Sequence, residues 1–393
     1  MDAVTGYVEL GLRLGRHVDG LVDAYYGPPE LGERVAAEPL RDPGALAADA
    51  RLLADALAED PVDLAGTRRR WLHAQVIGLQ TVAERLAGVE LPYEDEVERC
   101  YGVRPRHVSE ADFDAAHAEL EELLPGDGSL PERYQAWREG DSIPADLLPT
   151  VVERVAAELR VRTARTFGLP DGEEATFDYV AAEPWSAYNY YLGKLRSRIA
   201  VNTDLPTAKN FVTDLVAHET YPGHHTEHAW KEHLLLARAG QLEASILMIG
   251  TPESLVSEGI AMLGPELLLG EELERLAAEQ LGAAGLDYNP ELAAAVKRAR
   301  RPIELVPGNA ALMLHSDGAT RDDALAYVRR WGLASEARAE QTVRFVSHPV
   351  WRSYIATYTD GYRVCSEFVR GEPARFRRLL TEQLAPADLI ATS

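Results

Sequence analysis

The sequence predicts a mostly α-helical protein with one small β ribbon, placed directly before a cluster of histidines. Apolar residues recur at helical spacing through most of the 393 residues. The pattern changes between residues 173 and 205, where ATFDYVAAE, SAYNYYLG and RSRIAVNTD are rich in aromatic and β-branched residues. Four of the chain's 11 histidines then fall between positions 218 and 228. We therefore expect a multi-helical fold with a short antiparallel ribbon before the helix that carries these histidines.

Composition narrows the class of protein further. The chain has 40 Lys and Arg against 63 Asp and Glu, a formal net charge of −23, which argues against a nucleic-acid partner. Its two cysteines, Cys100 and Cys365, are too few for a disulfide framework and favour a reducing compartment. Charged residues interrupt every long apolar run, so no signal peptide or membrane span is expected. We expect a cytoplasmic protein without a membrane partner, and the sequence leaves its oligomeric state open.

The first part of the chain is predicted to be helical throughout. Helices are predicted at residues 3–25, 43–59, 64–87, 110–124, 131–138 and 145–168. Proline and glycine divide them, with Pro61 between the second and third, and Ser109 with Asp112 resembles a capping box. Residues 1–150 then form a helical N-terminal half and residues 151–393 a second half with the ribbon and the histidines. Because no repeat or linker separates the halves, we expect one compact unit.

The histidine cluster is typical of a metal site, because neutral imidazole is a common zinc ligand. In the HExxH motif two histidines stand four apart on one helical face, with the Glu as general base. Here His218-Glu219 is followed at the fourth position by Pro222. On a straight helix His225 returns to within about 20° of His218 but lies about 10.5 Å further along the axis. Since Pro222 should kink the helix, we favour His225 as second ligand, with His224 as the alternative.

Another interpretation of the histidine cluster places the metal only on residues that follow Pro222. His224 and His228 are four apart with Glu227 between them, an inverted HxxEH pattern. In either arrangement a catalytic zinc needs a third protein ligand and an open position for water. The best candidate is Glu258 in LVSEGIAML, because a lone carboxylate among apolar residues is costly to bury unless it is paired or bound to metal.

These motifs resemble a known family. HETYPGHH followed by SEGIAM resembles the large family catalogued as domain of unknown function 885, whose members carry an HE-x-x-PGHH signature and a downstream Glu-Gly. That family is similar to the helical zinc peptidases that include carboxypeptidase Taq, which implies a zincin-like fold. The similarity runs from about residue 150 to the C-terminus and includes RIAVNTDLP, RARRPIELVPGNAALMLHSDGAT and TYTDGYRV. The chain departs from the family pattern at Ala311, Met313 and Ala319.

The resemblance implies a metal-dependent hydrolase, a metallopeptidase of carboxypeptidase-like type acting on a peptide or small amide. Zinc chemistry then makes Glu219 the general base that takes a proton from metal-bound water. Tyr358 or Tyr362, and His315, which matches a family histidine, are the expected donors to the oxyanion. The basic stretch at 297–301 is either a solvated helix face or, alternatively, the source of an arginine that anchors a substrate carboxylate.

Two other functions are compatible with the same residues. Two histidines and one carboxylate also suit ferrous iron, so the chain is alternatively a metal-dependent tailoring enzyme acting on a small metabolite. The altered motif around Pro222 and the departure at Ala311 allow a third hypothesis, a non-catalytic helical protein that binds peptides through a degenerate site.

Overall fold

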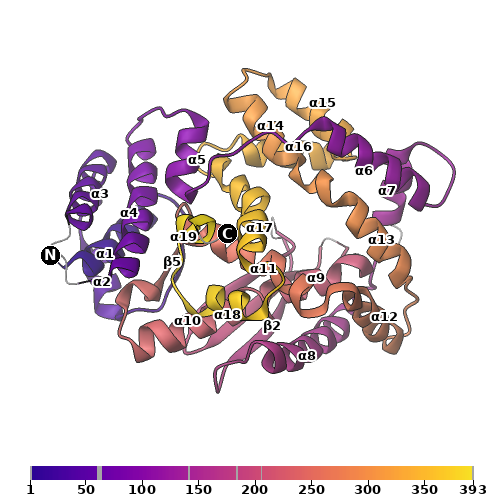
Figure 1. Ribbon diagram of the computed structural model, residues 1–393, viewed down its shortest axis with the longest axis horizontal. Helices are drawn as coiled ribbons and strands as arrows, with labels where there is room; N and C mark the ends of the chain where they lie inside the picture. The colour runs from indigo at the N-terminus through magenta and orange to yellow at the C-terminus, as the bar shows by residue number, and fades with distance from the viewer. Residues whose placement is uncertain (1, 60–63, 140–141, 183–184, 205, 392–393) are drawn as a thin grey trace.

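The computed structural model describes residues 2–59, 64–139, 142–182, 185–204 and 206–391. Most of these residues lie in helices, which confirms the predicted mostly α-helical class (Figure 1). Two small sheets accompany the helices within the described ranges. Pro61, expected to separate two helices, lies outside them.

Five of the N-terminal helices begin and end within three residues of the predicted positions, whereas the helices at 29–37 and 93–101 were not predicted. In chain order, the N-terminal helices are α1 (Ala3–Gly15), α2 (Pro29–Ala37), α3 (Pro43–Ala58), α4 (Gly66–Leu86), α5 (Tyr93–Tyr101), α6 (Glu110–Leu123), α7 (Leu130–Glu139) and α8 (Leu148–Thr166). Side chains cap three of them: Asp2 accepts from the Thr5 amide at α1, Asp42 from the amides of Gly44 and Ala45 at α3, and Ser109 from the Ala111 amide at α6. Ser109 thus caps α6 without the reciprocal contact expected from Asp112.

The predicted helix over residues 3–25 is wrong in its second half. The helix α1 ends at Gly15, and Val22–Tyr25 form strand β1, which pairs antiparallel with β5 (Ile246–Met248). Gly20 has φ 77°, a left-handed conformation that interrupts helical propagation. The apolar residues that follow are buried by this long-range pairing, which the local helical spacing did not reveal.

The predicted ribbon exists, but its strands are not all antiparallel. It contains β2 (Glu174–Val180), β3 (Ala187–Gly193) and β4 (Arg196–Asn202), in the order β2-β4-β3. The strands β3 and β4 form an antiparallel hairpin, whereas β2 pairs parallel with β4. The strand β3 follows β2 in the chain but does not pair with it. The next strand, β4, lies between the two and runs antiparallel to β3, and therefore parallel to β2. As predicted, this sheet comes directly before the helix that carries His218 and Glu219.

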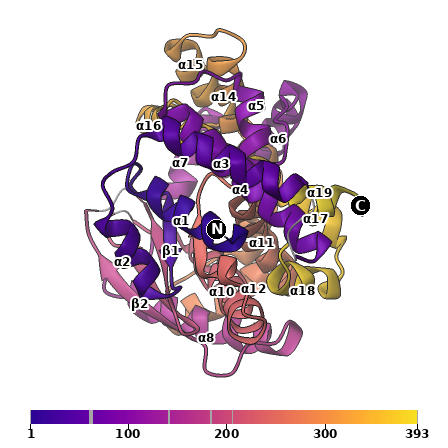
Figure 2. The ribbon, with the colours of Figure 1, turned by 90° about the vertical axis from the view of Figure 1, so that its left-hand side faces the viewer.

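The second half of the chain is again helical. Its elements are α9 (Lys209–Glu219), α10 (His224–Lys231), η1 (Glu232–Arg238), η2 (Leu242–Ser245), α11 (Pro252–Leu269), η3 (Gly270–Glu272), α12 (Leu273–Ala283), α13 (Pro290–Arg300), η4 (Arg301–Leu305), α14 (Val306–His315), α15 (Arg321–Trp331), α16 (Glu336–Val346), η5 (Arg352–Tyr354), α17 (Ile355–Val369), α18 (Pro373–Thr381) and α19 (Pro386–Ala391). Figure 2 shows the three-stranded sheet on one side of the molecule and α17 to α19 on the other, with α10 and α11 between them.

The hydrophobic cores join segments that are distant in the sequence. Tyr7 and Trp71 share one core with Ile246 and Met248 of β5. A second core combines α6 and α7 with α13 to α16. Figure 1 accordingly shows α1 to α4 at one end of the molecule and α6 and α7 at the other. The boundary predicted at residue 150 falls inside α8, and the division into two halves stays a prediction.

Candidate metal centre

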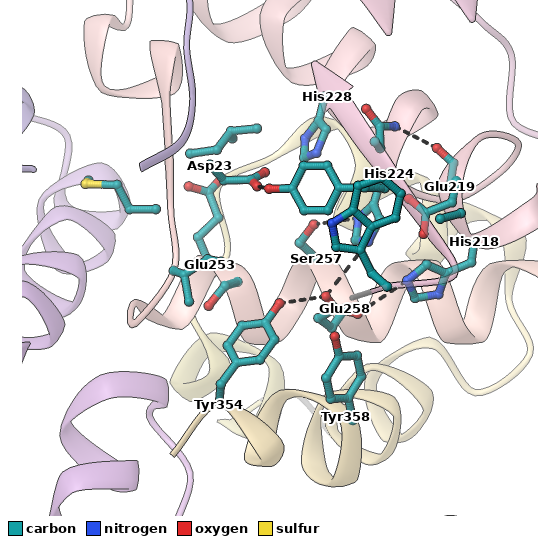
Figure 3. Close-up of a pocket in the computed structure, with 18 residues that line it drawn as sticks. Asp23, His218, Glu219, His224, His228, Glu253, Ser257, Glu258, Tyr354 and Tyr358 are labelled. Atoms are coloured by element: carbon teal, nitrogen blue, oxygen red, sulfur yellow. Dashed lines mark hydrogen bonds and ion pairs between the residues drawn. The ribbon is translucent and has the colours of Figure 1, made fainter. Parts of the chain in front are cut away.

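A cavity of about 300 Å³ lies where β3, α9, α10, α11 and α17 meet (Figure 3). Three potential metal ligands converge on it, one from each of three helices. The Nε2 atom of His218 lies 3.4 Å from Oε2 of Glu258, and Nε2 of His224 lies 3.9 Å from Oε1 of the same carboxylate. One ligand atom from each of the three residues lies within 4.8 Å of the others. The sequence predicted two of these residues as ligands and kept the third, His224, as an alternative.

The break after Glu219 is what brings His224 to His218. The expected kinked helix is two helices, because α9 ends at Glu219 and α10 begins at His224. The Tyr221–Pro222 peptide bond between them is cis. Gly223 packs against the end of α9, where its amide donates to the carbonyl of Ala217 at 3.0 Å. The imidazoles of His218 and His224 then meet at right angles, with ring centroids 4.7 Å apart.

His225, the favoured second ligand, is not part of this group. Its side chain is fully buried, with Nδ1 2.8 Å from the Ser197 hydroxyl and Nε2 2.8 Å from a carboxylate oxygen of Glu173. Consecutive residues on a helix point about 100° apart, so only one of the two histidines can face Glu258. Because α10 starts a new helix with its own orientation, the angular relation to His218 on a straight helix no longer applies.

The inverted motif is also close together in space. Ligand atoms of His224, Glu227 and His228 lie within 4.8 Å of one another. However, Glu227 accepts hydrogen bonds from Lys231 at 2.7 Å and from the Ser257 hydroxyl at 2.5 Å, so both of its oxygens are occupied. Burial lowers the pKa of His228 to about 3, which keeps this imidazole neutral.

Ser257 connects the two motifs. Its hydroxyl donates to Glu227, so it accepts from the imidazole of His224, whose Nδ1 lies 3.2 Å away. This arrangement places the proton of His224 on Nδ1 and leaves Nε2 bare toward Glu258. A polar partner that fixes the orientation and tautomer of a ligating histidine is a regular feature of metal sites. Glu227 therefore acts through Ser257 rather than as a ligand itself.

Glu219, the predicted base, lines the cavity beside His218 (Figure 3). Burial raises the pKa of its carboxyl group above the ordinary value, and the charges of His218 and His224 offset part of that effect. Its backbone carbonyl accepts a hydrogen bond from the amide nitrogen of Asn189 at 2.7 Å, which ties the end of α9 to β3. Glu219 thus presents a carboxyl group to the cavity beside His218.

Of the predicted oxyanion donors, one lines the cavity and two lie elsewhere. Tyr358 lines the cavity, as expected. His315 does not: its Nε2 lies 2.7 Å from the carbonyl of Val346, and its ring packs against Tyr93, because α14 ends at His315 facing α16 rather than the cavity. Tyr362 also lies outside the described lining and donates to Glu266 at 2.9 Å.

Two cavity residues near the site were missed by the sequence reasoning. Tyr354 donates its hydroxyl to Oε1 of Glu258 at 2.8 Å, and its spacing of four from Tyr358 was a signal that could have found it. Asp23 lines the cavity from β1. It was missed because its segment was interpreted as part of a helix, in which nothing links it to residues 200 positions away.

Neither a family model nor a curated protein matches the sequence. Among solved structures, the chain resembles a "putative lipoprotein" from Colwellia psychrerythraea, with a TM-score of 0.52 and 16% identity. That match covers 86% of this chain and 65% of the other, so this chain spans about two thirds of the length of the longer protein. A "putative lipoprotein of unknown function" from Shewanella oneidensis gives a TM-score of 0.48 at 15% identity, covering 92% and 69% of the two chains. At these identities the likeness to the Colwellia protein shows a shared fold alone. No helix among the described residues is long and apolar enough to cross a membrane.

Proposed function

We propose that this chain is a zinc-dependent hydrolase of peptide or small amide bonds, with His218, His224 and Glu258 as metal ligands. One observation carries the proposal: two imidazoles and a carboxylate from three helices meet at a cavity that Glu219 also lines. Two histidines and a glutamate are the protein ligands of catalytic zinc in several metallopeptidases, where the fourth position stays open. The resemblance of HETYPGHH to the domain of unknown function 885 family supports the same function.

The surroundings of the three residues suit a metal ion. Oε2 of Glu258 is buried without a hydrogen bond among the described residues and lies 3.4 Å from Nε2 of His218, so both atoms face a position that one cation could share. Its other oxygen is held by Tyr354, and the proton of His224 is held by Ser257. The polar atoms of Glu258 and His224 that face away from the group are therefore engaged, while those that face inward are available.

The chain's own residues then have definite tasks. A zinc ion held by His218, His224 and Glu258 would supply a bound water of lowered pKa and would polarise the scissile carbonyl. Glu219 takes the proton of that water at its carboxylate and passes it to the leaving amine, a role that suits a carboxyl group with a raised pKa. The Tyr358 hydroxyl is the donor for the oxyanion. Ala187 and Tyr188 of β3 line the cavity, and β3 is one of the two outer strands of the described sheet, which favours an extended substrate beside it.

Metal analysis of histidine variants tests the ligand assignment. We expect the full chain, purified without chelators, to hold about one zinc ion, because three preformed ligands bind it. His218→Ala and His224→Ala should each lose most of this zinc. His225→Ala is the matched control: it removes a neighbouring imidazole that bonds Ser197 and Glu173, so folded protein should keep its zinc. A wild-type chain without stoichiometric metal, or loss of zinc in His225→Ala but not in His224→Ala, would contradict the proposal.

Hydrolysis is tested separately with Glu219→Gln. This variant keeps a similar shape but cannot take a proton, so we expect unchanged zinc content and turnover of amide substrates reduced by about 100-fold or more. Zinc is measured by elemental analysis and turnover by release of a chromogenic amine. Undiminished turnover in this variant would remove Glu219 as the base.

A second candidate function shares the same ligands. Two imidazoles and one carboxylate with open positions are also a ligand set for ferrous iron and oxygen chemistry. Activity that requires Fe(II) and consumes oxygen, measured with an oxygen electrode on iron-loaded and zinc-loaded chain in parallel, would favour a tailoring enzyme over a hydrolase.

A further inference from the structure

The cavity carries more negative charge than the metal-ligand group uses. Besides Glu219 and Glu258, it is lined by Asp23 from β1 and by Glu253 near the start of α11. None of the described residues that line it is a lysine or an arginine. Figure 3 shows Asp23 and Glu253 across the view from His218 and Glu219, so the two additional carboxylates form a separate side of the cavity.

Asp23 is held in place by Tyr188, whose hydroxyl donates to one of its oxygens. Burial raises the pKa of this carboxyl group, and the charges of His224 and Glu258 are close enough to affect it as well. A phenol neutralises no charge. A carboxylate in this position therefore favours a cationic group within the cavity.

The negative charge of Glu253 is also only partly balanced by a neighbouring cation. Lys231 donates to Glu227 at 2.7 Å and to Glu253 at 3.2 Å, and all three residues are buried. One ammonium group facing two carboxylates leaves an excess of one negative charge at the cavity wall. Burial accordingly raises the pKa of Glu253, with the charge of Lys231 acting in the opposite direction.

A buried acceptor beside Glu219 also calls for a donor from a ligand. Asn189 is only 8% exposed, lines the cavity, and donates its amide nitrogen to the carbonyl of Glu219. Because that carbonyl can only accept, the amide orientation is fixed and Oδ1 faces the other way. Oδ1 is buried and has no hydrogen-bond partner among the described residues. A buried acceptor of this kind is satisfied by a ligand that brings a donor.

Two aromatic rings also line the cavity, and one of them belongs to Tyr188, which contacts Asp23. The rings are those of Trp185 and Tyr188, with centroids 5.8 Å apart. Aromatic faces attract ammonium groups and present no donor to a carboxylate. The basic residues that could anchor a substrate carboxylate lie elsewhere: Lys297 pairs with Asp214, Arg300 with Glu304 and Arg301 with Glu266.

We propose that Asp23 and Glu253 form a subsite for the free ammonium group of the substrate. The chain then acts at the amino end of a short peptide or aminoacyl amide, in contrast to the carboxypeptidase-like specificity that the resemblance implies. This inference rests on the proposed hydrolase function for its reaction, but the ammonium subsite itself is a binding property that is measurable without turnover.

The test compares two probes that differ only in the amino group. L-leucinamide and N-acetyl-L-leucinamide are titrated calorimetrically into full-length Glu219→Gln protein, once loaded with zinc and once stripped of metal. We expect the free amine to bind at least about tenfold more tightly than the acetylated probe in both forms, because only the former brings a charged donor. Equal binding of the two probes, or tighter binding of the acetylated one, would overturn the subsite.

Variants identify the residues responsible. Asp23→Asn keeps an acceptor for Tyr188 but removes the charge, and it should weaken leucinamide binding about tenfold or more while leaving the acetylated probe unchanged. The matched control is Asp178→Asn, which changes an exposed aspartate paired with Arg198 and should alter neither probe. If Asp23→Asn does not fold, Glu253→Gln gives the same comparison. Unchanged leucinamide binding in a folded cavity variant would contradict the assignment.

Turnover of two substrates distinguishes a wrong subsite proposal from a wrong hydrolase proposal. Zinc-loaded wild-type chain is given leucine p-nitroanilide with a free amine and the same anilide with an N-acetyl group. Cleavage of the free-amine substrate at least about tenfold faster supports the subsite. Equal or preferred cleavage of the blocked substrate upholds a hydrolase but overturns the subsite. If neither substrate is cleaved, the hydrolase proposal is contradicted, and the calorimetric comparison of the two leucinamide probes still tests the subsite.

Discussion

At the scale of single residues, Glu258 determines the charge balance of the cavity. Burial opposes charge on both Glu258 and His218, yet their proximity raises the pKa of His218 and lowers that of Glu258. Tyr354 adds a hydrogen bond to the same carboxylate. A buried carboxylate without such partners costs several kcal/mol, so these contacts explain how an apolar helix tolerates Glu258 at its centre.

The buried pair of Glu173 and His225 leads to a prediction about acid stability. Burial pushes the pKa of Glu173 up, but hydrogen bonds from His225 and Tyr221 and the charge of Arg160 outweigh it, so the net pKa is lowered. A lowered pKa in the folded state contributes stability that is present above the unfolded value of about 4.5 and is lost as the pH falls through the folded value. We expect Glu173→Gln to unfold about 2–3 kcal/mol more easily at pH 7, because hydrogen bonds to a charged group are lost.

The measurement is urea unfolding of metal-free protein at pH 7 and at pH 4. The difference between wild type and Glu173→Gln should shrink at the lower pH. The neighbouring Glu174→Gln is the matched control, because Glu174 is exposed and its loss should change the free energy of unfolding by less than about 0.5 kcal/mol. Equal effects of the two substitutions at pH 7 would contradict this role of Glu173.

At the scale of secondary-structure elements, the break between α9 and α10 decides which histidine reaches Glu258. Gly223 is necessary there because of a close approach of two backbone segments. A Cβ atom at this position would lie 1.9 Å from the carbonyl oxygen of His218 and 2.7 Å from that of Ala217. The start of α10 is therefore fixed directly against the end of α9, and His224 and His218 follow.

Gly223→Ala should separate the two helices. We expect a loss of zinc affinity of at least about tenfold and a loss of about 1–3 kcal/mol in stability, because a carbonyl of the backbone must move. Zinc competition with a chromogenic chelator and thermal unfolding measure the two effects. Gly282→Ala is the control: it lies on α12 with no atom within 4 Å of the added carbon and should be neutral or slightly stabilising. Unchanged zinc affinity in Gly223→Ala would show that the contact does not position His224.

At the scale of the whole molecule, the cavity is assembled from segments far apart in the sequence. Its walls come from β1 near the N-terminus, from β3 and the helices around position 220, and from Tyr354 and Tyr358 near the C-terminus. The cores that support these walls also cross the chain: Gly11 of α1 lies so close to Met248 that an added Cβ would be 2.1 Å from its sulfur. Folding of the first half therefore depends on the second.

We expect a fragment of residues 2–147 not to fold on its own. Its α1 would lose β5, and its α6 and α7 would lose the helices that cover Phe113 and Tyr134. Thermal unfolding followed by circular dichroism should show a gradual change for the fragment and a cooperative transition for the full chain. A cooperative transition in the fragment would instead support an independent N-terminal domain.

The helical class, the position of the small sheet and the stretch that carries the metal-ligand candidates could all be predicted from the sequence. These features depend on local periodicity and on the density of one residue type, which are visible without contacts. His218, Glu219 and Glu258 could be predicted because closely spaced histidines are typical of metal sites, and because a lone carboxylate in an apolar helix needs a partner.

The remaining features depend on contacts between distant segments. His224 rather than His225 lies beside His218 and Glu258, because the orientation of α10 depends on the contact of Gly223 with α9. His315 lies outside the cavity, whereas Asp23 and Tyr354 line it, because their positions depend on long-range packing and on the β1–β5 pairing. The sheet is mixed, since strand order is set by tertiary contacts and not by the strands' own residues. Local patterns specify which groups can do chemistry, and the packing of distant segments decides which of them meet.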